Sequence, residues 1–314
     1  WPPAHATKGW PPVPVPESEG YARSRDQIES MIRKIDTYKL RWDEWFNLVQ
    51  TRLMPSFTPV GFKKMKAPQH LFEKLNASYY ANLGNTRQEH FSHNPNSGIP
   101  TDLLPNFISQ GRLNNEIMHE LKPIHEEWAG VELNYGQSYG VRVYKNGSTL
   151  VNHVDRSETH VISCIFHIAH DLDEPWPLEI EDHDGVVHAV NMEPGDMVMY
   201  ESAKQFHARM TPMRGRHYGS LFIHYYPAHD WNWTMWDVHV AVPPHFLDTT
   251  ATSTNGTARD EIFELGRTPL MQYYHEYWDE RGEGFVPPAM GIDTPVQTMS
   301  HAAFRERIPL RHEL

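Results

Sequence analysis

Hydrophobic positions divide the chain into a helical first part and a strand-rich centre. From Arg23 to about Met54, apolar residues recur near the spacing of one helix face, which predicts one long or two abutting amphipathic helices. A further helix is predicted over Leu113 to Trp128. Amphipathic helices of this kind are typical of segments that cover one face of a sheet.

The pattern changes between Val131 and Pro227 to short segments rich in β-branched and aromatic residues, broken by Gly, Asn and Asp. Asp184-Gly185 lies between two such runs, Leu178–Ile180 and Val186–Val190, and predicts a tight hairpin turn. Short antiparallel strands in this number indicate a sandwich or jelly roll. We therefore expect an α+β protein with a double-stranded β-helix (jelly-roll) core and with N-terminal and C-terminal flanking helices.

The same pattern predicts four regions. Residues 1–22 form a Pro-rich extended tail, and residues 23–130 form an N-terminal helical region that packs on the core. Residues 131–228 form the jelly-roll core. Residues 229–314 form a C-terminal extension that starts with Trp231, Trp233 and Trp236 and contains a helix from Ala258 to about Arg281.

Charge and hydropathy narrow the classes of partner. The formal net charge is −12 and Lys and Arg form no cluster, which argues against binding of nucleic acid or of an anionic membrane surface. The longest apolar runs, such as Val161–Ile168, are far shorter than a membrane span. Peptide, protein or small-molecule substrates remain.

Features that bear on the compartment point in two directions. Cys164 is the only cysteine, which excludes an intramolecular disulfide and favours a reducing compartment. Against this, glycosylation sequons begin at Asn76, Asn146, Asn232 and Asn255, and the final Glu313-Leu314 matches the end of a retention signal for the endoplasmic reticulum. Together these features favour the secretory pathway, in the endoplasmic reticulum lumen, over the cytoplasm.

His153 and Asp155 have the types and spacing of metal ligands. Fe(II) that must also bind a bidentate co-substrate and O₂ leaves the protein three coordination sites, which two imidazoles and one carboxylate fill. Residues i and i+2 of a strand point to the same side, so His153 and Asp155 can reach one ion, and the third ligand must come from a later strand. His-x-Asp alone is a weak signal, and an ordinary hydrogen-bonded pair at a strand end is the alternative.

The segment from Tyr144 to Asp155 resembles the prolyl 4-hydroxylase family of Fe(II)- and 2-oxoglutarate-dependent dioxygenases, in which Tyr, a turn Gly and His-x-Asp occur at these spacings. Val161–Ile168 is similar to the family's next core strand, and Pro194–Tyr200 is similar to its Gly-Asp turn and following strand. The resemblance covers Tyr139 to Tyr226. It implies a catalytic Fe(II) held by His153, Asp155 and His207 as the distal ligand, 2-oxoglutarate as co-substrate, and ascorbate as a candidate reductant.

The resemblance also implies a set of co-substrate contacts. Tyr144 and Ser163, the latter at a family Thr position, are expected to contact 2-oxoglutarate. The family places a Lys or Arg ten residues after the distal histidine, where it pairs with the distal carboxylate of 2-oxoglutarate. In this chain that position is His217.

His217 departs from the family pattern and leaves two alternatives open. A cationic imidazole also binds a carboxylate, because an adjacent anion raises its pKa. Arg216 or Arg214 would take the role after a one-residue slip of the strand. Strand alternation puts His217 on the same side as Leu221 and Ile223, which favours His217.

Two further residues share a face with these candidates. His167 and Ser163 are four residues apart on one predicted strand, so their side chains lie on the same face. His167 therefore either faces the cofactor or is a core histidine with a satisfied hydrogen bond. Arg142 has the parity of Tyr144, and it either binds an anion inside the barrel or forms an ion pair at the surface.

The function expected from these features is hydroxylation of an unactivated C–H bond, first of all in a peptidyl residue such as proline, with release of succinate and CO₂. The partner is then a peptide or protein. The family's Gly-Gly-Glu-Thr stretch is replaced by Glu174–Glu179, which keeps hydroxylation of a small molecule as an alternative. A non-catalytic metal-binding or lectin-like jelly-roll module is the alternative from a different class.

Overall fold

A computed structural model of the chain describes residues 54–89, 103–229 and 231, together with isolated helical positions between residues 20 and 51. The chain separates into two units, Met54–Trp231 and a second unit formed by Trp1–Leu53 and Asn232–Leu314. The fold below is that of the first unit. The predicted Pro-rich tail, most of the helical segment from Arg23 to Met54, and the helix from Ala258 lie outside the described residues.

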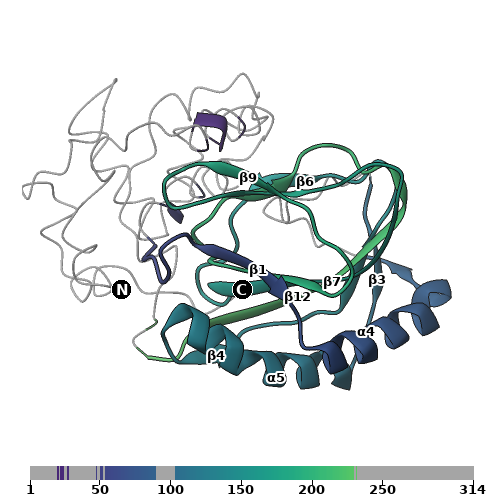
Figure 1. Cartoon of the computed structure of the whole chain (residues 1–314), viewed down its shortest axis with the longest axis horizontal. Helices are drawn as coiled ribbons and strands as arrows, with labels where there is room; N and C mark the ends of the chain where they lie inside the picture. Colours follow the sequence, from purple (N-terminus) through teal and green to yellow (C-terminus); the bar gives the residue numbers. More distant parts are fainter. Residues whose placement is uncertain are drawn as a thin grey trace, which may run out of the picture. The chain divides into compact units, whose positions relative to one another are not determined.

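Two antiparallel sheets form the domain (Figure 1). The larger sheet has the strand order β1-β10-β7-β12-β5-β3-β2, with β4 paired to β12, and the smaller sheet has the order β6-β11-β8-β9. The strands are β1 Phe62–Lys66, β2 Arg87–Gln88, β3 Asn106–Ile108, β4 Leu133–Tyr135, β5 Val141–Tyr144, β6 Leu150–His153, β7 Ile162–Leu172, β8 Leu178–Glu181, β9 Val187–Val190, β10 Asp196–Tyr200, β11 His207–Arg209 and β12 Gly215–Pro227.

The strands from β5 to β12 cross between the sheets in the order of a jelly roll. Successive strands belong to the larger, smaller, larger, smaller, smaller, larger, smaller and larger sheet. Their alternating residues turn one side chain in two toward the space between the sheets. The predicted jelly-roll core is therefore confirmed.

The space between the sheets is filled by apolar side chains from both layers. One cluster joins Ile165, Val198 and Tyr200 of the larger sheet to Leu178 and Ile180 of the smaller one. A second, aromatic cluster consists of Tyr144, Trp176, Met213 and Tyr218. Phe222 packs against both clusters, so the interior is continuous. Burial of each large apolar side chain contributes roughly 1.5–3 kcal/mol.

Helices α4 (Gln69–Asn82) and α5 (Arg112–Ala129) lie along the larger sheet, away from the smaller one (Figure 1), and the short helix η1 (Leu83–Asn85) follows α4. In α4, Leu71, Leu75 and Tyr79 recur every fourth residue and are buried. Tyr225 of β12 donates a hydrogen bond to the carbonyl oxygen of Met118 in α5, at 2.7 Å. The α5 helix confirms the one predicted over Leu113 to Trp128.

Two local features bear on the sequence-based expectations. The hairpin at Asp184-Gly185 is confirmed, because β8 pairs with β9 and Gly185 has a φ of 80°. The region before residue 131 contributes strands as well as helices: β1 pairs with β10 and β3 pairs with β5. The sheets therefore begin well before the predicted core boundary.

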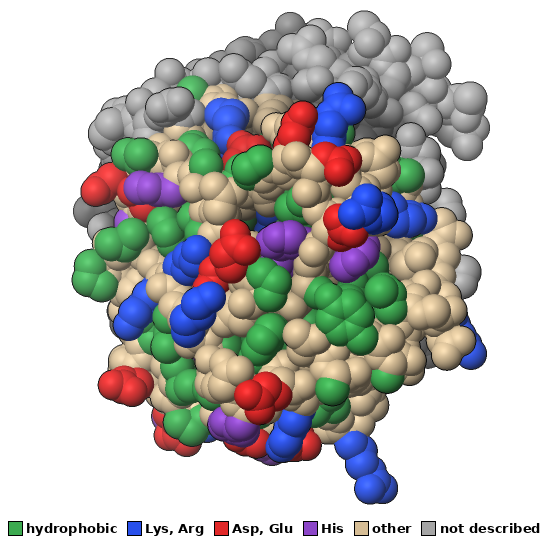
Figure 2. Space-filling view, turned by 45° about the vertical axis from the view of Figure 1, so that its right-hand side comes forward, with side chains coloured by type: hydrophobic (Ala, Val, Ile, Leu, Met, Phe, Trp, Pro, Cys, Tyr) green, Lys and Arg blue, Asp and Glu red, His purple; other side chains and the backbone are tan. Residues whose placement is uncertain are grey.

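The surface of the described domain is mixed in charge. On the face shown in Figure 2, acidic and basic side chains are interspersed, and histidine side chains reach the surface among them. None of the helices in the described part of the chain is long and apolar enough to cross a membrane.

A glycine packed against backbone provides a test of this fold. A Cβ added at Gly136 would lie 2.3 Å from the carbonyl oxygen of Thr159 and 2.6 Å from that of His224, neither of which can move aside as a side chain does. We expect Gly136→Ala to lower the free energy of unfolding by about 1–3 kcal/mol, as measured in urea.

Gly84→Ala is the matched control, because a Cβ there meets nothing within 4 Å. Its free energy of unfolding should stay within about 0.5 kcal/mol of the parent value. Equal effects of the two substitutions would contradict the packing around Gly136.

Candidate metal centre

The three predicted ligands come from neighbouring strands of the smaller sheet. His153 is the last residue of β6, and His207 is the first residue of β11. The antiparallel register places His207 directly opposite His153, with ring centroids 4.3 Å apart. Asp155 follows two residues after β6, and its backbone N–H donates to the carbonyl oxygen of Ser202 at 2.8 Å. The structure thus brings together the residues that the sequence pattern suggested.

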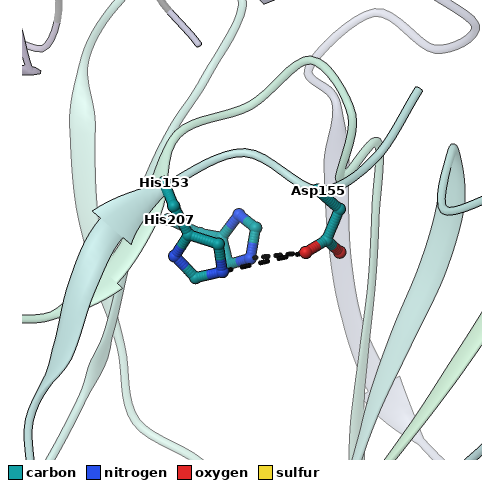
Figure 3. Close-up of side chains that lie close together, drawn as sticks. All are labelled: His153, Asp155 and His207. Atoms are coloured by element: carbon teal, nitrogen blue, oxygen red, sulfur yellow. Dashed lines mark ion pairs between the residues drawn. The ribbon is translucent and has the colours of Figure 1, made fainter. Parts of the chain in front are cut away.

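The donor atoms face a common point (Figure 3). Oδ1 of Asp155 lies 3.7 Å from Nε2 of His153 and 3.9 Å from Nε2 of His207. One ligand atom from each residue lies within 4.8 Å of the other two. Bonds of about 2.1 Å at right angles would require donor atoms about 3 Å apart, so small side-chain movements would complete the site. Two imidazoles and a carboxylate fit a divalent first-row metal ion.

Backbone hydrogen bonds set the tautomer of both histidines. Nδ1 of His153 lies 2.7 Å from the carbonyl oxygen of Val151, and Nδ1 of His207 lies 3.0 Å from that of Gln205. A carbonyl oxygen can only accept, so both Nδ1 atoms carry the hydrogen and donate it. The lone pair is then on Nε2, which is the atom that faces Asp155. This arrangement is typical of metal-ligating histidines.

Burial keeps both imidazoles neutral. It lowers the pKa of His153 to about 4, with repulsion from His207 as the next contribution. It also lowers the pKa of His207 to about 4. Because these values lie below the ordinary histidine pKa, both rings are neutral at pH 7 and have a lone pair available for a metal ion.

A chain of hydrogen bonds runs behind Asp155. Ser202 donates to the carbonyl oxygen of His160 at 2.7 Å, so Ser163 donates its hydroxyl to Ser202 at 2.5 Å and accepts from Nδ1 of His224 at 2.7 Å. Nδ1 of His224 also lies 3.7 Å from Oδ2 of Asp155. Ser163 therefore lies beside the metal centre, within a protein network. Its contact with a co-substrate stays a prediction.

Tyr144 and Arg142 extend from β5 into the interior. Nη1 of Arg142 lies 3.4 Å from the hydroxyl of Tyr144, which is buried. The guanidinium also lies 5.2 Å from the ring centroid of Phe222 and forms a two-point ion pair with Glu89, at 2.7 and 2.8 Å. Arg142 thus faces the interior and has a carboxylate partner from the chain itself. Contact of Tyr144 with 2-oxoglutarate stays a prediction.

His217 and Arg216 lie elsewhere. Nδ1 of His217 is 2.9 Å from the hydroxyl of Tyr79 in α4, on the helix-covered face of the larger sheet. Arg216 is exposed and pairs with Asp171. The structure does not bring either side chain to the metal centre. His217 does share a face with Leu221 and Ile223, as strand alternation indicated, but this face packs against helices rather than lining the interior.

His167 is a core histidine. It is fully buried, and its ring stacks on Tyr218 with centroids 4.1 Å apart. Its Nε2 lies 2.8 Å from Nδ1 of His170, and its Nδ1 lies 3.2 Å from the hydroxyl of Ser220. Of the two alternatives, the structure supports a histidine with satisfied hydrogen bonds.

Two interior residues were missed at the sequence level. His224 of β12 reaches Asp155, and Arg209 of β11 is buried two residues after His207. The available signal for Arg209 was strand alternation counted from His207, which puts both side chains on one face. For His224 the available signal was the alternation of side chains along β12, but alternation does not say which of the two faces turns inward.

Comparisons with known proteins give a likeness of structure. No family model matches the chain, and no curated protein matches it in sequence. A prolyl 4-hydroxylase from Pseudomonas putida aligns over 54% of this chain and 94% of its own, at 17% identity and a TM-score of 0.40. A prolyl hydroxylase from Trichoplax adhaerens, solved with a hypoxia-inducible factor peptide, aligns over 62% and 94%, at 10% identity and a TM-score of 0.41. The α-ketoglutarate-dependent epimerase SnoN from nogalamycin biosynthesis aligns over 54% and 78%, at 12% identity and a TM-score of 0.42.

The metal centre predicts a selective loss of metal affinity. We expect His153→Ala and His207→Ala to weaken binding of Mn(II) more than about 100-fold, as measured by calorimetry, because each removes one of three ligands. His229→Ala, at an exposed histidine paired with Glu132, should leave the affinity unchanged. Undiminished Mn(II) binding in both ligand variants would rule out this site.

Proposed function

We propose that the protein is an Fe(II)- and 2-oxoglutarate-dependent oxygenase that hydroxylates an unactivated C–H bond. The convergence of His153, Asp155 and His207 inside a jelly roll is the observation that supports this function. These three residues would hold Fe(II) and would leave coordination positions for a chelating co-substrate and O₂. When bound, Fe(II) and 2-oxoglutarate supply oxidative decarboxylation to succinate and CO₂, coupled to substrate hydroxylation.

The chain's own residues contribute position and shielding. Only 9% of His153 and 2% of His207 is exposed, so bulk water has little access to the ligand atoms. The ring of Tyr200 packs edge-on against His207, with centroids 4.9 Å apart, and restricts the imidazole further. The backbone bonds of both histidines fix their Nε2 atoms toward Asp155. Ascorbate is the candidate reductant for Fe(II).

The substrate that we propose is a peptidyl residue, with proline first, on the resemblance of Tyr144 to Asp155 to the prolyl 4-hydroxylase family. Tyr139 is a candidate contact for such a substrate, because it is 58% exposed and its ring lies 6.3 Å from that of His160.

A small-molecule substrate is the second candidate, favoured by one departure from the family pattern. The segment Glu174–Glu179, in place of Gly-Gly-Glu-Thr, carries Trp176 into the barrel interior. Its Nε1 donates to the carbonyl oxygen of Thr211 at 2.7 Å. A bulky indole at this position changes the space between the sheets.

We also propose that the protein works in the secretory pathway, in the endoplasmic reticulum lumen. Among the sequons, Asn146 is an exposed residue in the turn between β5 and β6. Co-localisation of the tagged full chain with a marker of this lumen is the expected result. A cytoplasmic distribution would contradict it.

Spectroscopy tests the metal and co-substrate chemistry directly. Anaerobic addition of Fe(II) and 2-oxoglutarate should produce a weak metal-to-ligand charge-transfer band in the visible. His153→Ala and His207→Ala should abolish this band, and His229→Ala should retain it, since His229 pairs with Glu132 at the surface. A non-catalytic jelly-roll module would give no band in the parent protein.

Turnover tests the substrate class. Proline-rich peptides should stimulate succinate release by the Fe(II)-loaded protein, and mass spectrometry should find one added oxygen on a peptide residue. Stimulation by small molecules alone would favour the second candidate. Succinate release with no peptide product would contradict peptidyl hydroxylation.

A further inference from the structure

Arg209 is a buried charge in the interior of the barrel. It is the last residue of β11, and 3% of it is exposed. It follows the metal ligand His207 by two residues, so the two Cα atoms are roughly 7 Å apart and the side chains share a face. His207 pairs with Ile180, whose side chain belongs to the interior cluster, so this is the inner face.

The groups that hold Arg209 are uncharged. Nη1 donates to the carbonyl oxygen of Trp176, and Nη2 donates to the hydroxyl of Tyr218 at 2.9 Å. The guanidinium also lies 4.6 Å from the ring centroid of Trp176 and 4.5 Å from that of Tyr218. The two rings are themselves in edge-on contact, with centroids 5.1 Å apart, so the cation lies beside both of them.

No carboxylate among the described residues forms an ion pair with Arg209. This distinguishes it from Arg142, which pairs with Glu89, and from Arg216, which pairs with Asp171. The nearby His167 cannot compensate this charge, because an imidazole is either neutral or positively charged. The positive charge of Arg209 is therefore buried without an anion from the described part of the chain.

An anionic ligand would complete this arrangement. A buried charge is unfavourable unless it is paired, and a guanidinium is planar, permanently charged and matched to a carboxylate through two parallel hydrogen bonds. Trp176 and Tyr218 use two of its five N–H donors. Their rings also hold the guanidinium in place before a ligand arrives.

We propose that Arg209 binds the distal carboxylate of the 2-oxo dicarboxylic acid chelated at the metal centre. This inference rests on the proposed function and concerns its co-substrate. Two methylene groups separate the keto carbon of 2-oxoglutarate from that carboxylate. This length agrees with the separation of roughly 7 Å between the Cα atoms of His207 and Arg209. The cation thus comes from β11, while His217 and Arg216 of β12 lie away from the centre.

A pair of ligands isolates this role. 2-Oxopentanoate keeps the chelating end of 2-oxoglutarate and replaces the distal carboxylate with a methyl group. Calorimetry with the Mn(II)-loaded protein under anaerobic conditions should show 2-oxoglutarate binding at least about 100-fold more tightly, because one buried charge pair has this order of effect.

In Arg209→Met, 2-oxoglutarate should lose this advantage, while 2-oxopentanoate should bind within a few-fold of its affinity for the parent protein. Arg209→Gln, which keeps hydrogen-bond donors but removes the charge, carries the same expectation and guards against misfolding of the first variant. Arg209→Lys should restore part of the preference. Arg216→Met is the matched control at an exposed arginine and should keep the full preference.

The outcomes separate this inference from the proposed function. If neither keto acid binds to the Mn(II)-loaded parent protein, the proposed function fails and the role of Arg209 fails with it. If both bind and the preference for 2-oxoglutarate persists in Arg209→Met or Arg209→Gln, the oxygenase assignment stands and the assignment of Arg209 is overturned. Loss of preference in Arg216→Met would also overturn it.

Discussion

The register between β6 and β11 is the constraint on which the metal centre depends. Because His207 lies opposite His153, both imidazoles reach one point from adjacent strands. A shift of one residue in β11 would turn His207 outward and bring Ala208 inward, since side chains alternate between faces. Asp155 lies beyond the end of β6, and its backbone bond to Ser202, shortly before β11, sets its position. The hydrogen bonds of the barrel thus fix all three donor groups.

Charge inside the barrel is distributed along its length. At one end, the carboxylate of Asp155 lies beside neutral histidines. The positive charge of Arg142 is compensated there by an ion pair with Glu89. Farther along the inner face, Arg209 lies among aromatic rings and has no carboxylate partner from the described residues. A ligand with a chelating end and an anionic end matches this polarity.

One face of β12 lines the interior, and the other packs against the helices. Phe222 and His224 turn toward the interior, where they contact the clusters and Asp155. His217 and Tyr225 turn toward α4 and α5 and hold the helices on the sheet. A Cβ at Gly219 would lie 2.5 Å from the ring of Tyr79, so this face allows the helix to approach closely. The helix-packed face cannot also line a co-substrate pocket, and this explains why His217 is absent from the interior.

Local patterns determined much of this protein. The period-two alternation, the Asp184-Gly185 turn and the helical spacing of residues 113–128 depend on neighbours in sequence, and the strands, hairpin and helix all followed. Strand alternation indicated that His153 and Asp155 can reach one ion, and the resemblance of the surrounding segments to the prolyl 4-hydroxylase family added His207. Only the tertiary structure decided which face of β12 is the inner one. Strand alternation says which residues of β12 share a face, but it does not say which of the two faces turns inward. The ion pair of Arg142 with Glu89 and the contacts of Arg209 with aromatic rings also join residues that are distant in sequence. Only the packing of the two sheets brings these residues together.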